Sequence, residues 1–167
     1  MYPNPPQVIN HFADANHHGG PWDGAKAIVL HHTAGVNSLA WLSTTPGSGV
    51  SVHCLIHKNG TIYRIVPDGK QAWHVGRSAV GNYGRSGSAG TPNECCLGIE
   101  IENLGNGRDP FTDEQYWSVG YQICQWWNAH GDIPVLTHQL VDTQGKNDPY
   151  NFDVIRALRC ALMWYDR

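Results

Sequence analysis

The sequence contains no stretch long and apolar enough to span a membrane, and no strongly basic segment. None of its apolar runs approaches the roughly 18 residues that a membrane-spanning helix needs. Its 11 lysines and arginines are outnumbered by 14 acidic residues, and they form no stripe of the kind that nucleic-acid binding usually requires. We therefore expect neither membrane insertion nor a nucleic-acid partner.

A disulfide framework and a secretory signal peptide are also missing. The five cysteines are scattered, odd in number and include no CxxC pair, which favours synthesis in a reducing compartment. The first residues, MYPNPPQVINHF, lack the basic region and apolar run of a signal peptide. These features predict a soluble protein that is cytosolic or is exported by the machinery of another protein.

Histidine and tryptophan, in contrast, are plentiful. The chain has 10 histidines and 7 tryptophans among 167 residues, a length that suits one domain with a core of its own. Both residue types favour sites where polar chemistry meets flat, apolar or sugar-like ligands. The composition therefore indicates a functional site without identifying it.

Three segments carry strand patterns. Residues 25–35 form a short β-rich run, and residues 50–66 contain two apolar-alternating runs joined at Asn59-Gly60, a strong hairpin signal. In CLGIEIEN, alternation places Leu97, Ile99 and Ile101 on one face of a strand. The same alternation turns the carboxylates of Glu100 and Glu102 away from the core.

Helices are expected between and after these strands. The segment 112–131 opens with Thr112, has Gln115 three positions later as in a capping box, and stops at Gly131. A short helix is expected over residues 37–44 and a final one from about residue 153 to 165. The apolar positions that define the final helix are Val154, Ala157, Leu158, Ala161 and Leu162. Strands interleaved with helices predict an α/β domain.

The loop HQLVDTQGKNDPYNFD carries more functional groups than turn formation requires. His138 and Asp148 lie in it, and His31 ends the first predicted strand. Imidazole nitrogen and carboxylate oxygen are ligands that zinc prefers, and three protein ligands leave a fourth position open in catalytic sites. Their spacing matches no short zinc signature, so ordinary surface or core histidines remain an alternative on spacing alone.

Four blocks follow one another along the chain: IVLHHTAG, SVHCLIHKNGTIYRIVPDGKQAWHVG, CLGIEIEN and HQLVDTQGKNDPYNFD. Together they resemble the zinc-dependent N-acetylmuramoyl-L-alanine amidases, a family that includes phage endolysins, anhydromuropeptide amidases and peptidoglycan recognition proteins. The resemblance covers about residues 21–165. It implies one catalytic domain over residues 1–167, with a central mixed β-sheet flanked by helices and no separate wall-binding domain.

The resemblance also implies roles for individual residues. His31, His138 and Asp148 would bind one Zn²⁺ per chain. Lys146 matches a lysine that assists catalysis, and Glu100 matches the catalytic carboxylate of the anhydromuropeptide amidases.

Further positions of the second block match the family with one departure. Trp73 and His74, together with the Gly-rich loop 76–90, are expected to line a groove for glycan or stem peptide, and His53 is expected to be structural. Val52 stands where many members carry a catalytic tyrosine. Because valine cannot donate a hydrogen bond, we expect it to pack on one hairpin face. The neighbours expected on that face are Val50, Cys54 and Ile56.

The implied activity is hydrolysis of the amide bond between N-acetylmuramic acid and L-alanine in bacterial peptidoglycan, by a monomer made in the bacterial cytoplasm. Only residues 35–49 separate the first two blocks, and this short spacing favours a phage or prophage endolysin, which acts on the cell wall after release. A cytosolic amidase that recycles anhydromuropeptides is the first alternative. A peptidoglycan-binding module without activity is the second, although Asp148 is present where such modules lose a metal ligand.

Overall fold

The computed structural model describes residues 4–14, 17–22, 24–76, 91–142 and 145–165. Its centre is a six-stranded sheet with the strand order β1-β5-β4-β7-β3-β8. The strands are β1 (Val8–Asn10), β3 (Ala27–His32), β4 (Cys54–Ile56), β5 (Ile62–Arg64), β7 (Cys96–Ile101) and β8 (Val135–Thr137). Only β4 and β5 pair antiparallel, so the sheet is mixed. The predicted single-domain α/β fold with a mixed sheet between helices is confirmed.

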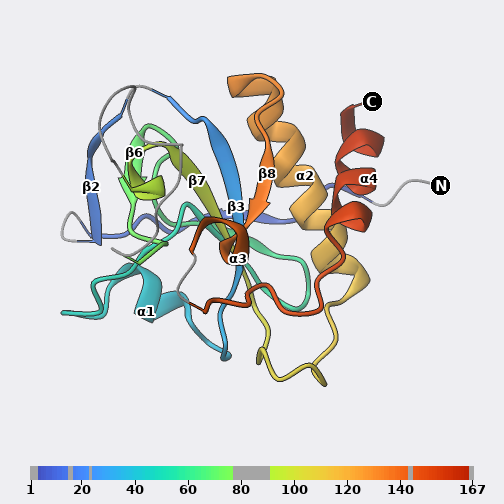
Figure 1. Ribbon diagram of the computed structural model, residues 1–167, viewed down its shortest axis with the longest axis horizontal. Helices are drawn as coiled ribbons and strands as arrows, with labels where there is room; N and C mark the ends of the chain where they lie inside the picture. Colours follow the sequence, from blue (N-terminus) through green and yellow to red (C-terminus); the bar gives the residue numbers. More distant parts are fainter. Residues whose placement is uncertain (1–3, 15–16, 23, 77–90, 143–144, 166–167) are drawn as a thin grey trace.

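Two long helices cover one face of this sheet. They are α2 (Asp113–His130) and α4 (Val154–Tyr165), which lie side by side in Figure 1. The short helices α1 (Leu39–Ser43) and α3 (His138–Val141) lie nearer the other face, with a small sheet of β2 (His18–Pro21) and β6 (Lys70–Ala72). A 3₁₀ helix, η2 (Pro92–Glu94), precedes β7. No helix in the described ranges is long and apolar enough to cross a membrane.

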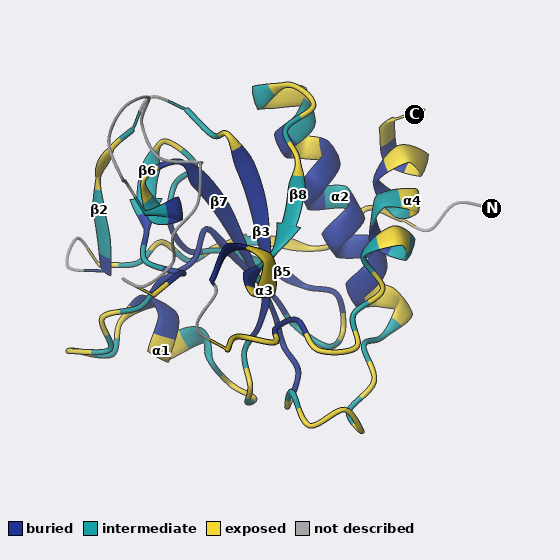
Figure 2. Ribbon diagram, viewed as in Figure 1, coloured by how far each residue is buried: buried dark blue, intermediate teal, exposed yellow. Residues whose placement is uncertain are grey.

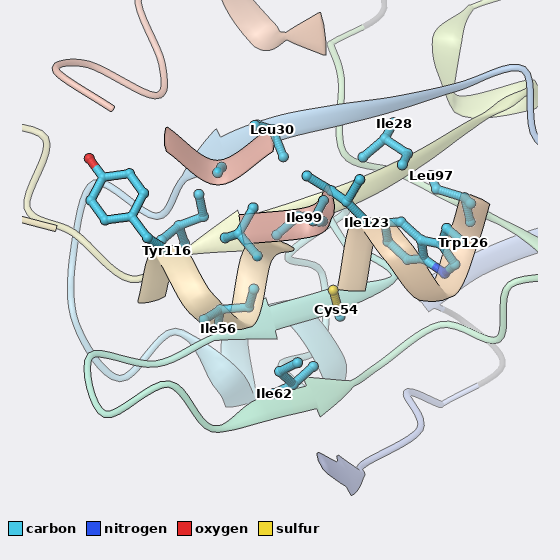
Figure 3. Close-up of a cluster of buried hydrophobic side chains, with 14 residues drawn as sticks. Ile28, Leu30, Cys54, Ile56, Ile62, Leu97, Ile99, Tyr116, Ile123 and Trp126 are labelled. Atoms are coloured by element: carbon cyan, nitrogen blue, oxygen red, sulfur yellow. The ribbon is translucent and has the colours of Figure 1, made fainter. Parts of the chain in front are cut away.

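The largest hydrophobic cluster lies between the sheet and the helices α2 and α4. Ile28 and Leu30 of β3 face Ile99 of β7 and Ile123 of α2, and all four side chains are fully buried (Figure 3). The buried residues of α2 form a stripe toward the sheet, whereas its outer positions are exposed (Figure 2). Burial of this apolar area provides the main driving force for joining the helices to the sheet.

Helix α2 begins and ends where the sequence predicts. The Thr112 hydroxyl accepts a hydrogen bond from the Gln115 backbone N–H at 3.1 Å, and the Gln115 side chain accepts one from the Thr112 N–H at 3.1 Å. This reciprocal capping box satisfies two N–H groups that a helix start leaves without partners. Gly131 ends the helix with a φ of 82°, which is costly for residues with a Cβ.

The opposite face of β3 and β7 carries smaller side chains and the polar residues. Ala27 and Val29 join Cys96 and Val141 in a second cluster. Because alternate residues of a strand point to opposite faces, His31 lies on the side of Ala27 and Val29. The helices α2 and α4 therefore cover one face of the sheet, and the other face can carry a functional site.

Glu102 differs from the prediction, which placed it beside Glu100 as a carboxylate facing away from the core. It is only 8% exposed, and its two carboxylate oxygens accept the backbone N–H groups of Asn37 at 3.0 Å and Lys58 at 3.2 Å. The prediction failed because β7 ends at Ile101, so the alternation of the strand no longer governs the next side chain. Glu102 thus binds the segments of Asn37 and Lys58 to the end of β7.

The predicted hairpin is present. Its register pairs Ile56 with Ile62, and Asn59-Gly60 lies in the connection over residues 57–61. In α4, Leu162 was expected on the packed face and is 56% exposed, whereas Trp164 is 9% exposed. The large indole occupies the space against Trp117, with ring centroids 4.4 Å apart.

Val52 is buried, but not on the face that alternation predicts. It packs with Leu55, Ile65 and Leu42 in a third cluster, whereas Cys54 belongs to the cluster under α2. Regular strand structure begins only at Cys54, so alternation does not extend back to residue 52. The side chain serves packing, as expected for a valine at this position.

Truncation of Val52 to alanine should therefore lower the free energy of unfolding by about 1–3 kcal/mol, because the deleted methyl groups leave a cavity in a packed cluster. Urea denaturation measures this loss. Val36→Ala is the matched control, since Val36 is 56% exposed and should lose little stability. Loss of activity in a folded, metal-loaded Val52→Ala protein would contradict a purely structural role.

Candidate metal centre and active site

Two parallel strands, β3 and β8, bring candidate ligands to one edge of the sheet. His31 lies near the end of β3, and His138 begins α3 directly after β8. Because β3 is parallel to both β7 and β8, the carboxyl ends of these strands meet at the same edge. Asp148 follows α3, and its backbone carbonyl accepts the Gln139 N–H at 3.2 Å, which ties the loop back to the helix.

The structure brings His31, His138 and Asp148 together as a candidate metal centre. Asp148 Oδ2 lies 2.9 Å from His138 Nδ1 and 3.3 Å from His31 Nδ1. One ligand atom from each residue lies within 4.8 Å of the others, and all three residues are at most 9% exposed. Zinc bonds of about 2.0–2.1 Å in a tetrahedron place neighbouring ligand atoms about 3.3 Å apart, so the two shorter spacings fit such an ion.

The ionisation states also suit a cation. Burial lowers the pKa of His31 to about 4 despite the neighbouring Asp148, so its imidazole is neutral at pH 7. Burial alone would raise the pKa of Asp148, but the two imidazoles beside it outweigh burial and hold that pKa well below its usual range. The donor set therefore includes a neutral imidazole at His31 and a carboxylate at Asp148, both of them forms that bind zinc, and the ring of His138 is the third candidate ligand.

His32 holds the loop that carries Asp148. Its side chain points to the other side of β3 from His31, and its Nδ1 accepts the backbone N–H of Tyr150 at 3.0 Å. Tyr150 is two residues beyond Asp148. The paired histidines thus have separate tasks, one as a candidate ligand and one as a loop anchor.

Glu100 is the register partner of His31 on the adjacent strand β7 and faces the same side of the sheet. The residue is partly exposed, but its Oε2 atom is buried and has no hydrogen-bond partner among the described residues. Burial raises the pKa of Glu100 to about 8, the charge of Asp148 adds to this rise, and the charge of Lys146 opposes it. A carboxyl group with a pKa near neutrality suits proton transfer at pH 7.

One cavity of about 380 Å³ contains all the site residues that the sequence predicts. Those residues are His31, Trp73, His74, Glu100, His138, Lys146 and Asp148. A neighbouring cavity of about 520 Å³ shares Trp73, His74, His138 and Lys146 with it and extends toward Asn93. The candidate metal centre therefore lies in a recess with room on two sides. Residues 77–90 of the predicted Gly-rich loop lie outside the described residues.

His74 lines both cavities, but its ring nitrogens are engaged within the protein. Nε2 lies 3.0 Å from the Cys96 carbonyl oxygen, and Nδ1 lies 2.9 Å from His31 Nε2. Both ring nitrogens thus have partners within the protein, and the expected substrate-binding role of His74 stays a prediction. His53 fits its expected structural role, since Nδ1 accepts the Gly98 N–H at 3.0 Å and Nε2 donates to the Lys70 carbonyl at 3.0 Å.

Sequence reasoning missed two residues of the site. Trp41 of α1 is 52% exposed and lines the cavity that contains the candidate ligands, a position that its helical spacing does not reveal. Asp142 is buried, and its Oδ2 lies 3.7 Å from His138 Nε2 at the i,i+4 spacing of one helical turn. That spacing, His138 followed by Asp142, was a signal available in the sequence.

Comparison with known proteins identifies relatives of the chain. It is 44% identical over 71 residues to the 1,6-anhydro-N-acetylmuramyl-L-alanine amidase AmpD of Haemophilus influenzae, a match that covers 42% of this chain. The chain spans only 34% of the length of that relative.

Solved structures share the fold over most of the chain. The complex of Escherichia coli N-acetylmuramyl-L-alanine amidase AmiD with anhydro-N-acetylmuramic acid-L-Ala-D-gamma-Glu-L-Lys superposes with a TM-score of 0.66 and 27% identity, covering 81% of this chain and 57% of that one. The endolysine N-acetylmuramoyl-L-alanine amidase LysCS of Clostridium intestinale URNW gives a TM-score of 0.65 at 20% identity, covering 96% and 97%.

The family assignment rests on the greater part of the chain. Residues 21–151 match the N-acetylmuramoyl-L-alanine amidase family, and this range contains five of the six strands of the central sheet, α2 and all three candidate metal ligands. The chain belongs to the N-acetylmuramoyl-L-alanine amidase family.

Proposed function

We propose that the chain is a zinc-dependent N-acetylmuramoyl-L-alanine amidase that hydrolyses the amide bond between N-acetylmuramic acid and L-alanine of peptidoglycan. The single observation that carries this proposal is the shared cavity of about 380 Å³, in which Glu100 and Lys146 lie with His31, His138 and Asp148. Family membership supports the reaction class, and the substrate named in the AmiD complex supports the substrate class.

His31, His138 and Asp148 would hold the zinc ion. Bound zinc would polarise the lactyl carbonyl and lower the pKa of a water molecule toward about 7. Burial keeps the imidazole of His31 neutral, and the buried positions of both histidines fix the directions of their rings, so that they do not have to reorganise during the reaction.

Glu100 would accept a proton from the attacking water and transfer it to the departing amine of L-alanine. Its raised pKa, about 8, makes both the acceptance and the release of a proton possible near neutral pH. The products are a muramic acid carboxylate and a free L-alanine amino group, which together account for the amide and one water. No other carboxylate among the described lining residues is left for this task, since Asp148 belongs to the metal centre.

Lys146 would stabilise the negative charge that develops on the carbonyl oxygen. Its side chain lines both cavities, and it is exposed enough to reach a bound substrate. One such donor typically contributes about 3–4 kcal/mol to the transition state. Trp73 would provide a flat apolar wall to the substrate, while its backbone N–H is held by the Ser51 hydroxyl at 2.9 Å.

The physical form of the substrate has two candidates. The identity to an anhydro-N-acetylmuramyl amidase favours soluble anhydromuropeptides and a recycling role. The short segment between the first two sequence blocks and the likeness in fold to an endolysin favour the intact cell wall as substrate. A non-catalytic binding module is the weakest reading, because all three candidate ligands and Glu100 are present.

Product analysis distinguishes these possibilities. Incubation with purified cell walls and, separately, with a soluble anhydromuropeptide should release L-alanine amino termini without new reducing sugars. Preference for the soluble compound assigns recycling, and preference for the wall assigns the endolysin role. New reducing ends, or binding without any released amino termini, would overturn the proposed reaction.

Replacement of any one proposed ligand by alanine should abolish both zinc binding and activity, because two remaining ligands hold the ion too weakly. Zinc content and amide hydrolysis are measured on His31→Ala, His138→Ala and Asp148→Ala. The exposed Asp132 provides the control Asp132→Ala. A chelator should lower the melting temperature of the wild-type protein, since the ion binds only the folded chain. Full zinc occupancy in Asp148→Ala would show that the ligand set is misassigned.

Glu100→Gln should keep the fold and the zinc but lose about two to four decades of turnover, because the amide cannot accept a proton. Glu102 is unsuitable as a control, since its carboxylate binds two backbone N–H groups. The exposed Glu114 in the first turn of α2 is suitable instead, and Glu114→Gln should retain full turnover. A mild effect of Glu100→Gln would contradict the role of Glu100 in proton transfer, and zinc and Lys146 would then have to carry the reaction alone.

Glu100 should also shape the pH dependence of stability in the metal-free protein. Its pKa rises from 4.5 to about 8 on folding, so between these values the folded state binds more protons and stability falls as pH increases. Below about pH 6.5 the buried histidines of lowered pKa act in the opposite direction. Between pH 6.5 and 8, the wild type should therefore lose about 1–2 kcal/mol more than Glu100→Gln, as measured by urea denaturation. Equal losses of unfolding free energy in the two proteins would show that the pKa of Glu100 is not raised in the folded state.

A further inference from the structure

A line of hydrogen bonds connects the backbone of β7 to the candidate ligand His31. His74 Nε2 lies 3.0 Å from the Cys96 carbonyl oxygen, and His74 Nδ1 lies 2.9 Å from His31 Nε2. The two rings meet edge to face, with an interplanar angle of 83° and centroids 5.0 Å apart. All of these atoms are in the buried part of the site.

The carbonyl at one end determines where each proton lies. A carbonyl oxygen only accepts hydrogen bonds, so His74 Nε2 must carry the proton. Neutral His74 then has a lone pair on Nδ1, which requires His31 to donate from Nε2. Neutral His31 is left with its lone pair on Nδ1, which lies 3.3 Å from Asp148 Oδ2. The carboxylate also only accepts hydrogen bonds, so in this arrangement two lone pairs meet, which is favourable only when a cation is bound. Binding of a cation by His31 Nδ1 requires this neutral form of His31, and the hydrogen bond that its Nε2 donates requires a neutral His74 as acceptor.

We propose that His74 is a positioning residue that holds His31 in the Nε2–H tautomer and keeps Nδ1 of His31 available to the metal. The proposal rests on the metal centre described under the proposed function. This role is distinct from the direct role in substrate binding that the sequence suggested for His74. The imidazole acts through His31 and touches the metal centre only by way of this hydrogen bond.

Two features of its surroundings hold His74 in this position. The Asn93 side-chain oxygen accepts the backbone N–H groups of His74 at 3.0 Å and Val75 at 2.9 Å. Gly98 leaves the space that the ring occupies, because a Cβ at Gly98 would lie 2.7 Å from His74 Cγ and 2.8 Å from Nδ1. The glycine of CLGIE thus has a specific purpose in a strand where glycine is otherwise unfavourable.

Two substitutions of His74 separate its two hydrogen bonds. The side-chain oxygen of asparagine occupies roughly the place of Nδ1, so His74→Asn retains an acceptor for His31. The side-chain nitrogen of glutamine occupies roughly the place of Nε2, so His74→Gln retains the donor to Cys96 and loses the acceptor. Zinc affinity is measured by competition with a chromophoric chelator, and the tautomer of His31 by ¹⁵N NMR of the histidine side chains in the zinc-bound protein.

His74→Gln should weaken zinc binding by about 10–100-fold, the usual effect of removing a hydrogen-bond partner from a metal-bound histidine. His74→Asn should retain most of the affinity and the wild-type ¹⁵N pattern of His31. Circular dichroism and urea denaturation of the metal-free variants establish that both are folded. A purely structural role would lower stability in both without distinguishing their zinc affinities.

Gly98→Ala tests the same proposal without altering any polar group. The added methyl group should displace the His74 ring and lower zinc affinity in the same direction as His74→Gln. Gly69→Ala is the matched control, because nothing lies within 4 Å of a Cβ at Gly69.

The outcomes separate this inference from the proposed function. Tight zinc binding by the wild type with unchanged affinity in His74→Gln, or an Nδ1–H tautomer of His31 in the zinc-bound protein, would overturn the role of His74 alone. Failure of the wild type to bind zinc would overturn the metal centre and this inference together.

Discussion

The structure depends on a carboxylate, Asp148, held between two imidazoles below the protein surface. Burying an ionised carboxylate is costly unless other groups compensate for the lost hydration. Here the compensation comes from His31 and His138, and it is strong enough to hold the pKa of Asp148 well below its usual range. The arrangement persists only while β3, α3 and the loop after α3 stay in register.

The sheet makes this possible by giving each face a different task. Large apolar side chains on one face of β3 and β7 pack against α2 and α4, and they supply the stability of the domain. The other face presents His31 and Glu100 side by side from two paired strands. Because α2 and α4 pack against the opposite face, the strands can hold the Glu100 carboxyl beside the candidate ligands, although its Oε2 has no hydrogen-bond partner among the described residues. A rigid sheet thus supports groups that would be unfavourable on a mobile loop.

Patterns that depend on neighbouring residues were predictable from the sequence. The capping box of α2, the strand β7 with its alternating faces, and the hairpin partners β4 and β5 follow from local spacing. The gathering of His31, His138 and Asp148 came from resemblance to a family, since spacing alone did not distinguish ligands from ordinary histidines. Their placement in one cavity is the contribution of the structure.

Two residues owe their positions to contacts with distant segments. Glu102 meets Asn37, 65 positions away in sequence, and His74 meets His31, 43 positions away. Neither partner is visible in a window of the sequence. The predictions for Glu102 and Val52 failed because a strand pattern was extended past the residue where the strand ends or begins.

Because two histidines are adjacent at the end of β3, a change in the pairing register of this strand would exchange their positions. A shift of β3 by one residue would turn His32 toward the candidate metal centre. The Asp148 loop would then lose its hydrogen bond to His32, and His32 would take the place of His31 as a ligand of the same chemistry. The earlier residues of β3 disfavour this shift, because Ile28 and Leu30 face the helices whereas Ala27 and Val29 face the other side. In a shifted strand, Ile28 and Leu30 would have to fit into the cluster that holds Ala27 and Val29, and a void would remain under the helices. The apolar half of β3 thereby selects which of two identical side chains becomes the ligand.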